Sequence, residues 1–269
     1  MRSLFLFSLA IALCHAKRVV PWMCLERCGE DVNASLAQLA TLAGVAVTGV
    51  SYEAFQLGDN SSFADSGYSK VGAALQAMGL EAWPMVTSAD IGKLRELWTN
   101  KQKFIDEAVL ALKTLDANIT GYNVDFEPSG GDSPTNDDAL EFAAFLTEFA
   151  DALEPHGVKV AVNVATWTAF WDYDALEETS VDKFMTMDTY TGDSTLFVAR
   201  VENAVDAFDL EKLGIGIQTE NPLSTSPFDD AALQLRFDTL AKHHVQEVDI
   251  WSTPIPDSYI PFLKSFLSS

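Results

Sequence analysis

The sequence predicts an α/β protein: a single, minimal (β/α)8 barrel of the TIM type, without an insertion domain. Short β-rich runs recur along its 269 residues, and each is followed by a segment with helical periodicity. Several runs are continuously apolar, as strands buried on both faces of a parallel sheet are. Eight such units in a chain of about 250 residues match the size of this barrel.

The expected strands, in chain order, are 18–22, 45–52, 80–86, 119–127, 158–164, 183–190, 213–219 and 245–251. Between them, apolar side chains recur at helical spacing, for example over 104–115 and 140–153. Gly44, Gly79 and Gly157 each follow a helical segment, where a left-handed residue ends the helix. Two small domains or an open doubly wound sheet are the rival folds. No linker marks a domain boundary, and no G-x-G-x-x-G follows a strand.

The chain is strongly acidic, with 39 Asp and Glu against 17 Lys and Arg and a formal net charge of −22. Phosphate repels such a surface, so we expect no nucleic-acid partner. The 48% hydrophobic content argues against disorder. No phosphate loop, metal-ligand cluster or G-x-S-x-G motif is visible, so we expect no cofactor and no metal. We also expect a monomer.

Residues 1–16 have the layout of a secretory signal: Arg2, a short apolar core and Ala16 before Lys17. The apolar run is too short to span a bilayer, and no later stretch approaches that length, so we expect no membrane span. We divide the chain into a signal peptide, 1–16, and a barrel domain, 17–269. A buried N-terminal helix is the alternative interpretation of the first segment.

Cys24 and Cys28 remain once the signal is removed, and in an oxidising compartment a close pair predicts a small disulfide loop. A metal site lacks further ligands nearby, and a redox motif is normally spaced C-x-x-C. Three N-x-S/T sequons, at Asn33, Asn60 and Asn118, are candidate glycosylation sites. Together these features indicate a secreted or lysosome-like destination.

The fourth expected strand, 119–127, holds the main candidate site. Strand side chains alternate, so Asn123, Asp125 and Glu127 share one face, which in a barrel points to the axis. Buried carboxylates are costly in a packed interior but tolerable at the C-terminal mouth, where barrel enzymes keep their active sites. Pro128 ends the strand, so we expect Glu127 at the rim. An exposed acidic edge strand is the alternative.

Asp125 and Glu127 lie two residues apart, so their stems are roughly 7 Å apart on one side of any substrate. A conventional glycosidase pair flanks the scissile bond instead. The spacing suits a substrate that supplies its own nucleophile, such as the acetamido group of an N-acetylhexosamine. Glu127 would then protonate the leaving oxygen, and Asp125 would hold the acetamide and help to keep Glu127 protonated.

Residues 121–127, G-Y-N-V-D-F-E, resemble the D-G-x-D-x-D-x-E signature of family 18 glycoside hydrolases, the chitinases and chitobiases. The resemblance implies that Glu127 is the acid/base and Asp125 orients the acetamide. Thr120 stands at the first Asp of the signature and Asn123 at the second, where lysosomal chitobiases carry a similar Asn. The third-strand S-x-G-G of the family is missing.

Two further strands extend the resemblance. The segment 184–188, F-M-T-M-D, is similar to the M-x-Y-D of the sixth strand, with Asp188 in place and Met187 at the acetamide-binding Tyr. Tyr190, which we expect on the same face as Asp188, could substitute for that Tyr. Trp251 matches the aromatic floor on which the reacting sugar stacks. Gln218 ends the seventh strand and is a further substrate-binding candidate.

Tyr52 closes the second expected strand and Trp167 follows the fifth, at the expected mouth, where they could stack on sugar rings or simply pack in loops. The sequence therefore predicts a secreted enzyme that hydrolyses β-linked N-acetylglucosamine in chitin or chito-oligosaccharides, with a saccharide as its only partner. Two alternatives stay open: an inactive, lectin-like barrel that binds sugar, and a barrel hydrolase acting on another glycan.

Overall fold

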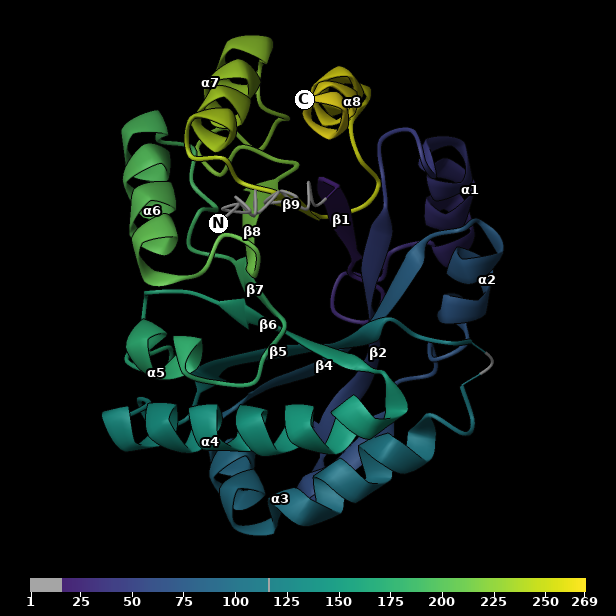
Figure 1. The fold of residues 1–269 in the computed structure, drawn as a ribbon, viewed down its shortest axis with the longest axis vertical. Coiled ribbons are helices and arrows are strands. Elements are labelled where there is room, and N and C mark those ends of the chain that lie inside the picture. The colour runs from purple at the N-terminus through teal and green to yellow at the C-terminus, as the bar shows by residue number, and fades with distance from the viewer. Residues whose placement is uncertain (1–15, 116) are drawn as a thin grey trace, which may run out of the picture.

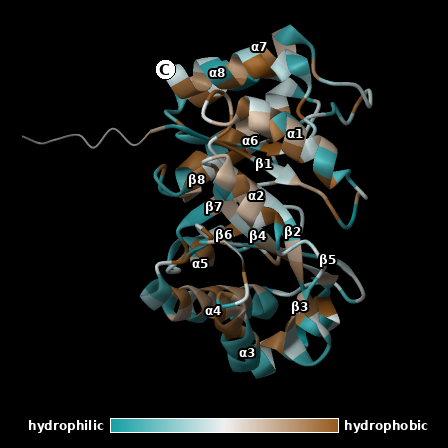
Figure 2. Cartoon of the chain, turned by 90° about the vertical axis from the view of Figure 1, so that its right-hand side faces the viewer, coloured by the Kyte–Doolittle hydropathy of each residue, from teal (hydrophilic) through white to brown (hydrophobic). Residues whose placement is uncertain are grey.

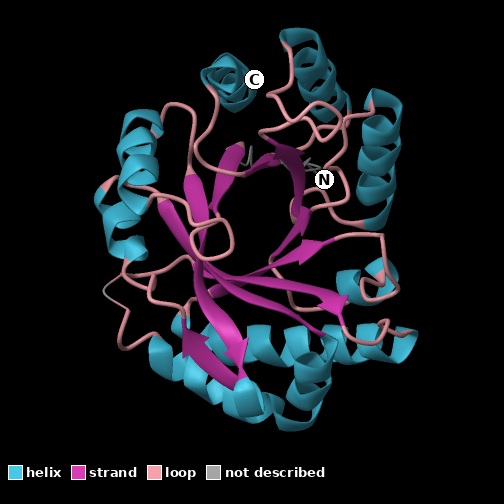
Figure 3. Cartoon of the chain, turned by 180° about the vertical axis from the view of Figure 1, so that it is seen from behind, coloured by secondary structure: helices cyan, strands magenta, loops and turns pink. Residues whose placement is uncertain are grey.

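The computed structural model describes residues 16–115 and 117–269, so the expected signal peptide lies outside the described residues except for Ala16. In the described part of the chain, eight parallel strands form a closed barrel surrounded by helices, as Figures 1 and 3 show. The predicted single (β/α)8 barrel is confirmed.

The barrel strands are β1 (Arg18–Met23), β2 (Gly49–Gly58), β4 (Glu81–Asp90), β5 (Gly121–Gly130), β6 (Lys159–Val164), β7 (Lys183–Thr186), β8 (Leu213–Gln218) and β9 (Glu247–Trp251). The helices are α1 (Val32–Leu42), α2 (Val71–Ala77), α3 (Ile91–Ala111), α4 (Asn136–Leu153), α5 (Tyr173–Glu177), α6 (Ser194–Ala207), α7 (Asp230–Lys242) and α8 (Ile260–Ser268). Hydrogen bonds join the strands in the order β1-β9-β8-β7-β6-β5-β4-β2, and pairing of β1 with β2 closes the ring.

Several strands differ from the sequence-based expectation. β4 and β5 run on to Asp90 and Gly130, where their ends pair, so the prediction that Pro128 ends the strand is wrong. β2 runs on to Gly58 and folds back as an antiparallel hairpin with β3 (Ser62–Asp65), which was not predicted. β7 ends at Thr186, four residues before the predicted end, because residues 187–190 form a turn. The Tyr190 N–H donates to the Met187 carbonyl at 3.0 Å within it.

Buried apolar side chains form two layers. The larger layer lies between the strands and the helices, where Tyr122, Val124 and Phe126 of β5 are buried. The smaller layer fills the barrel and includes Trp22 and Met185. The helices carry both hydrophilic and hydrophobic residues, as elements that cover a barrel on one face must (Figure 2). The side-chain alternation predicted for β5 is therefore confirmed.

Several acidic residues have a local structural task. Aspartate side chains accept backbone N–H groups at the first turns of five helices within the described residues, which satisfies donors that have no partner inside the helix. These N-caps are Asp31 of α1, Asp90 of α3, Asp172 of α5, Asp193 of α6 and Asp229 of α7. Some of the many acidic residues in the sequence therefore serve as helix N-caps next to the C-terminal ends of the strands.

Between β8 and α7 the chain has only the loop 219–229, so this position holds no insertion domain. Among residues 16–115 and 117–269, none of the helices combines the length and the apolar character needed to cross a bilayer.

Candidate active site

The site is built on β5, whose inward face carries Asn123, Asp125 and Glu127. Asn123 and Asp125 are almost fully buried, whereas the side chain of Glu127 is 29% exposed. The burial therefore decreases toward the C-terminal mouth, as expected for a strand that ends at Gly130. Glu127 is the most exposed member of this set.

Asp125 is held by hydrogen bonds on both carboxylate oxygens. Asn163 of β6 donates to its Oδ1 at 2.9 Å, and Arg27 donates to its Oδ2 at 2.6 Å. The Trp171 indole in turn donates to the Asn163 carbonyl at 3.1 Å. Sequence reasoning missed Asn163, although a lone amide in the apolar run V-A-V-N-V was a usable signal.

Arg27 was not predicted at the site, yet its guanidinium contacts three carboxylates. Nε donates to Glu53 Oε1, Nη2 to Asp125, and Nη1 to Glu127 Oε1 at 2.8 Å. Burial alone would lower the pKa of Arg27. The charges and hydrogen bonds of its three carboxylate partners outweigh this effect, so the pKa of Arg27 lies above its ordinary value. Arg27 is therefore a permanent cation in the site.

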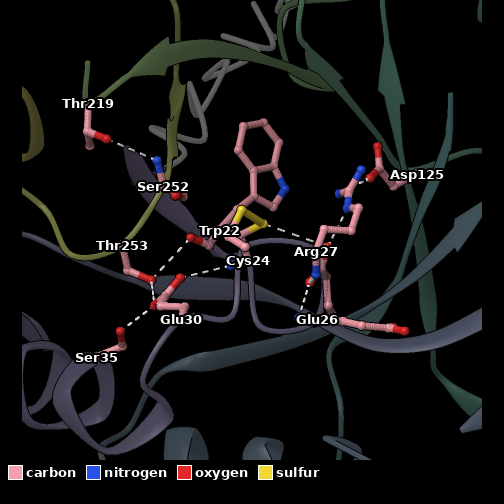
Figure 4. The surroundings of a disulfide bond; sticks show 12 residues. Trp22, Cys24, Glu26, Arg27, Glu30, Ser35, Asp125, Thr219, Ser252 and Thr253 are labelled. Atoms are coloured by element: carbon pink, nitrogen blue, oxygen red, sulfur yellow. Dashed lines mark hydrogen bonds and ion pairs between the residues drawn. A yellow bond between two sulfur atoms is a disulfide. The ribbon is translucent and has the colours of Figure 1, made fainter. Parts of the chain in front are cut away.

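The loop that carries Arg27 is closed by a disulfide between Cys24 and Cys28, so the predicted pairing is confirmed. Figure 4 shows the loop with Arg27 directed toward Asp125. Its backbone is fixed as well: Glu53 Oε2 accepts the N–H groups of Glu26 at 2.5 Å and of Arg27 at 3.1 Å. Sequence patterns that rely on strand or helix periodicity do not report such a loop.

Beside Cys24, Glu30 ties the same loop to its surroundings. Glu30 accepts the Cys24 N–H at 2.9 Å and the hydroxyls of Ser35 and Thr253 (Figure 4). Thr253 follows β9, the strand that pairs with β1, so this network ties the loop to the neighbouring segment of the mouth.

Glu127 has the electrostatics of a general acid. Its pKa is raised to about 7, first because burial disfavours the charged form and then because Asp125 adds a like charge and a hydrogen bond. Arg27 acts in the opposite direction and lowers this pKa. A carboxyl group whose pKa is raised by burial and by a neighbouring carboxylate is typical of acid catalysis by a protonated carboxylic acid.

An aromatic group lies in the barrel next to these carboxylates. Trp251, Trp22 and Tyr190 are in contact, with ring centroids 5.8 Å apart for the two tryptophans and 6.5 Å apart for Tyr190 and Trp251. The guanidinium carbon of Arg27 lies 5.4 Å from the Trp251 ring centroid. Trp22, on β1, was not predicted. Gln218 and Trp251 line one cavity of about 370 Å³.

Tyr190 projects into the barrel, although it lies in the turn after β7. Burial raises the pKa of its hydroxyl well above the ordinary value, and the charges of Asp249, Asp125 and Glu127 add to this effect. The hydroxyl has no hydrogen-bond partner within the described residues. It therefore keeps its proton and can donate it in a hydrogen bond.

Asn123 lies deeper in the barrel, where its Nδ2 donates to the Ser51 hydroxyl at 2.8 Å and contacts the Met185 sulfur at 3.6 Å. No hydrogen bond in the described part of the chain joins it to Asp125 or Glu127. Asn123 is therefore buried in the barrel interior, farther from the mouth than the two carboxylates.

Asp188 lies apart from the acid pair. Its Oδ2 accepts the Thr166 hydroxyl at 2.8 Å, and Arg200 donates to its backbone carbonyl. Burial raises the pKa of Asp188. Our expectation that Asp188 and Tyr190 share a face is wrong, because the strand ends at Thr186 and its alternation does not continue through the turn.

Tyr52 and Met187 are placed away from the mouth. Both are buried in the layer between the barrel and the helices, Tyr52 beside Gly72 of α2. The expectation that they line the mouth is wrong: Ser51 and Glu53 face inward on β2, so Tyr52 between them faces outward, and Met187 falls beyond the end of β7. Trp167 is 52% exposed and contacts Trp171 edge-on at 5.3 Å.

The asparagines of the three sequons, Asn33, Asn60 and Asn118, are all exposed. Within the described residues, no group of three or more His, Cys, Asp and Glu side chains is arranged to hold a metal ion.

Comparison with solved structures shows the same fold in chitinases and in a spore cortex-lytic enzyme. A chitinase from Chromobacterium violaceum superposes with a TM-score of 0.76 at 14% identity, over 94% of this chain and 100% of the other. Catalytic domain 2 of the Group II chitinase of Ostrinia furnacalis gives 0.74 at 13%, over 94% and 96%. The spore cortex-lytic enzyme SleL of Bacillus megaterium gives 0.75 at 12%, over 93% and 73%.

No protein-family model matches the sequence, and no curated protein is similar to it at a significant level. At 12–14% identity, the structural likeness shows the fold alone. The chain therefore has the (β/α)8 barrel fold found in solved chitinases.

Proposed function

We propose that this protein is a glycosidase that hydrolyses β-linked N-acetylglucosamine in chitin or chito-oligosaccharides, with retention of anomeric configuration. The observation that carries the proposal is the pair Asp125 and Glu127: Asp125 is held by hydrogen bonds from Asn163 and Arg27, and Glu127 is an acid with a pKa of about 7. The solved chitinases of the same fold support the choice of substrate.

In the proposed first step, Glu127 donates its proton to the glycosidic oxygen as that bond breaks. The carbonyl oxygen of the substrate's own acetamido group attacks the anomeric carbon and forms an oxazolinium ion. Asp125 accepts a hydrogen bond from the acetamido N–H and stabilises the positive charge that develops. Because the nucleophile comes from the substrate, two carboxylates on one strand suffice.

In the second step, ionised Glu127 takes a proton from water, which attacks the anomeric carbon and opens the oxazolinium ring. The product regains its acetamido group, and Glu127 is again protonated. The hydroxyl of Tyr190, which keeps its proton, is suited to donate to the acetamide carbonyl in place of the tyrosine expected at Met187. Trp251 offers a ring on which the reacting sugar can stack.

We further propose that the protein is secreted or reaches a lysosome-like compartment after removal of residues 1–16. The disulfide between Cys24 and Cys28 supports an oxidising destination, and the exposed sequon asparagines are accessible to glycosylation. The N-terminal sequence of the protein from a eukaryotic secretion host tests the cleavage after Ala16.

The experiment that tests the activity is the release of a fluorescent aglycone from N-acetylglucosamine mono-, di- and trisaccharides. We expect release by the wild type and at least a hundredfold loss in Glu127→Gln, which cannot donate a proton. Glu148→Gln, a substitution on the surface helix α4, is a matched control that should leave release unchanged. Normal turnover by Glu127→Gln would refute the assignment.

A non-catalytic, sugar-binding barrel is the second candidate, and one specific observation favours it. Arg27 pairs with both Asp125 and Glu127, as a residue that silences an acid pair would. Saccharide binding without any aglycone release, in the wild type and in a variant without Arg27, would favour this candidate over the enzyme.

A further inference from the structure

Arg27 and the reacting sugar compete for one position, if the function proposed above is correct. A reacting N-acetylhexosamine must stack on Trp251, contact Glu127 through its glycosidic oxygen and contact Asp125 through its acetamido N–H. The guanidinium of Arg27 lies 5.4 Å from the Trp251 ring centroid and donates hydrogen bonds to Glu127 and Asp125. The sugar and the guanidinium cannot make these contacts at the same time.

The backbone around Arg27 is fixed, whereas its side chain is partly exposed to solvent. The disulfide and the carboxylate of Glu53, which is 1% exposed, fix the loop at residues 24–28. The side chain of Arg27 is itself 40% exposed, so the guanidinium can leave without movement of the chain. The loop therefore presents the arginine to the site, and displacement of the guanidinium must also break the hydrogen bond from its Nε to Glu53 Oε1.

A destination for the displaced guanidinium lies next to the site. A cavity of about 390 Å³ adjoins Arg27, and its lining includes the carboxylates of Glu26 and Asp90, the cation Lys93, and polar and apolar side chains such as Gln56 and Leu57. The carboxylate of Glu26, and the Oδ2 of Asp90 whose Oδ1 caps α3, can replace part of the charge pairing that the guanidinium loses when it leaves Asp125 and Glu127, against the repulsion of Lys93.

We propose that Arg27 is a specificity-determining residue that acts as a built-in competitor for the reacting-sugar position. In the free protein its guanidinium occupies that position, and a saccharide binds only by displacing the side chain into the cavity beside Gln56 and Asp90. A ligand succeeds only if it returns a hydrogen-bond donor to Asp125 and also stacks on Trp251. An N-acetylhexosamine meets both conditions through its acetamido N–H and its ring face.

The test compares Arg27→Met, which keeps the length of the side chain without its charge, with the wild type. Calorimetric titration with the N-acetylglucosamine trisaccharide gives Kd, and aglycone release gives KM and kcat. Competition predicts that Kd and KM each fall at least fivefold in Arg27→Met. Arg95→Met is the matched control, since Arg95 is also ion-paired, with Asp138, but lies outside the site. It should leave both constants within twofold of the wild type.

Glu53 loses its guanidinium partner in Arg27→Met, so a second variant, Arg27→Met with Glu53→Gln, removes the unpaired buried charge and should show the same fall in Kd. Weaker binding or a higher KM in both variants would overturn the proposal, because Arg27 would then belong to the sugar-binding surface. Constants within twofold of the wild type would also overturn it.

The outcomes separate this inference from the proposed function. Aglycone release by both proteins without tighter binding in Arg27→Met refutes the competition and keeps the glycosidase. Tighter binding in Arg27→Met without release by either protein keeps the competition and refutes the glycosidase. Absence of binding by every variant refutes both.

Discussion

The rate of hydrolysis should fall above neutral pH as Glu127 ionises. Two substitutions should move this alkaline limb of the pH–rate profile in opposite directions. With a pKa of about 7, Glu127 is about 99% protonated at pH 5 and about 1% protonated at pH 9. The rate that depends on the acid therefore drops about tenfold for each pH unit above 7. Arg27→Met should move the limb upward, and Asp125→Asn should move it downward.

The directions follow from the charges around Glu127. Arg27 stabilises the carboxylate form, so its removal raises the pKa, whereas Asp125 destabilises that form, so its neutralisation lowers the pKa. Unit charges about 4 Å apart interact by about 4 kcal/mol at an effective dielectric constant of about 20, equal to about three pKa units. Solvent reaches the side chain of Glu127, which is 29% exposed, and reduces this value. We expect a shift of about one unit or more in each direction.

The assay is the pH dependence of kcat/KM for aglycone release between pH 4 and pH 10, because this ratio reports the pKa of the free enzyme. The position of the limb, not the absolute rate, carries the result, since Asp125→Asn also loses its contact with the acetamide. Arg95→Met serves as the control that keeps the wild-type limb. Shifts of the two variants in the same direction would refute the assignment of this pKa to Glu127.

Three other predictions concern binding and stability. Trp251→Ala should weaken binding of the N-acetylglucosamine trisaccharide about tenfold, through loss of ~1.4 kcal/mol of stacking, and unchanged calorimetric affinity would exclude Trp251 as the floor. Asp138→Asn should lower the free energy of unfolding by about 1–2 kcal/mol, because Asp138 accepts the Thr135 N–H in the capping box of α4 and pairs with Arg95 at 2.9 Å. Denaturant unfolding measures this, and unchanged stability would contradict it. Replacing Cys24 and Cys28 by serine should cost about 2 kcal/mol of unfolding free energy from loop entropy, and an unaltered denaturation midpoint would argue against this contribution.

The barrel and the acid pair were predictable because both depend on periodicity. Parallel strands buried on both faces appear as continuous apolar runs, and the apolar Val124 and Phe126 determine which side of β5 faces the helices. Once this alternation is known, the positions of Asp125 and Glu127 on the inner face follow without information from elsewhere in the chain.

The rest of the site depends on contacts that no local pattern reports. Arg27 and Asp125 are 98 residues apart and meet because a disulfide loop and the buried carboxylate of Glu53 aim the guanidinium. Tyr52 was misplaced for a simpler reason: of two neighbours on a strand only one faces the axis, and on β2 that residue is Glu53. Met187 was proposed from its place in the M-x-Y-D resemblance, but it lies beyond the end of β7 and packs in the layer between the barrel and the helices.

The anomeric configuration of the first product tests the central claim most directly. In the proposed mechanism, the acetamido group of the substrate attacks first and water attacks second, so two inversions at the anomeric carbon give net retention. Proton NMR during the first minutes of hydrolysis of an N-acetylglucosamine oligosaccharide distinguishes the anomers before mutarotation mixes them. We predict that the β-anomer appears first. Initial formation of the α-anomer would contradict the roles assigned to Asp125 and Glu127.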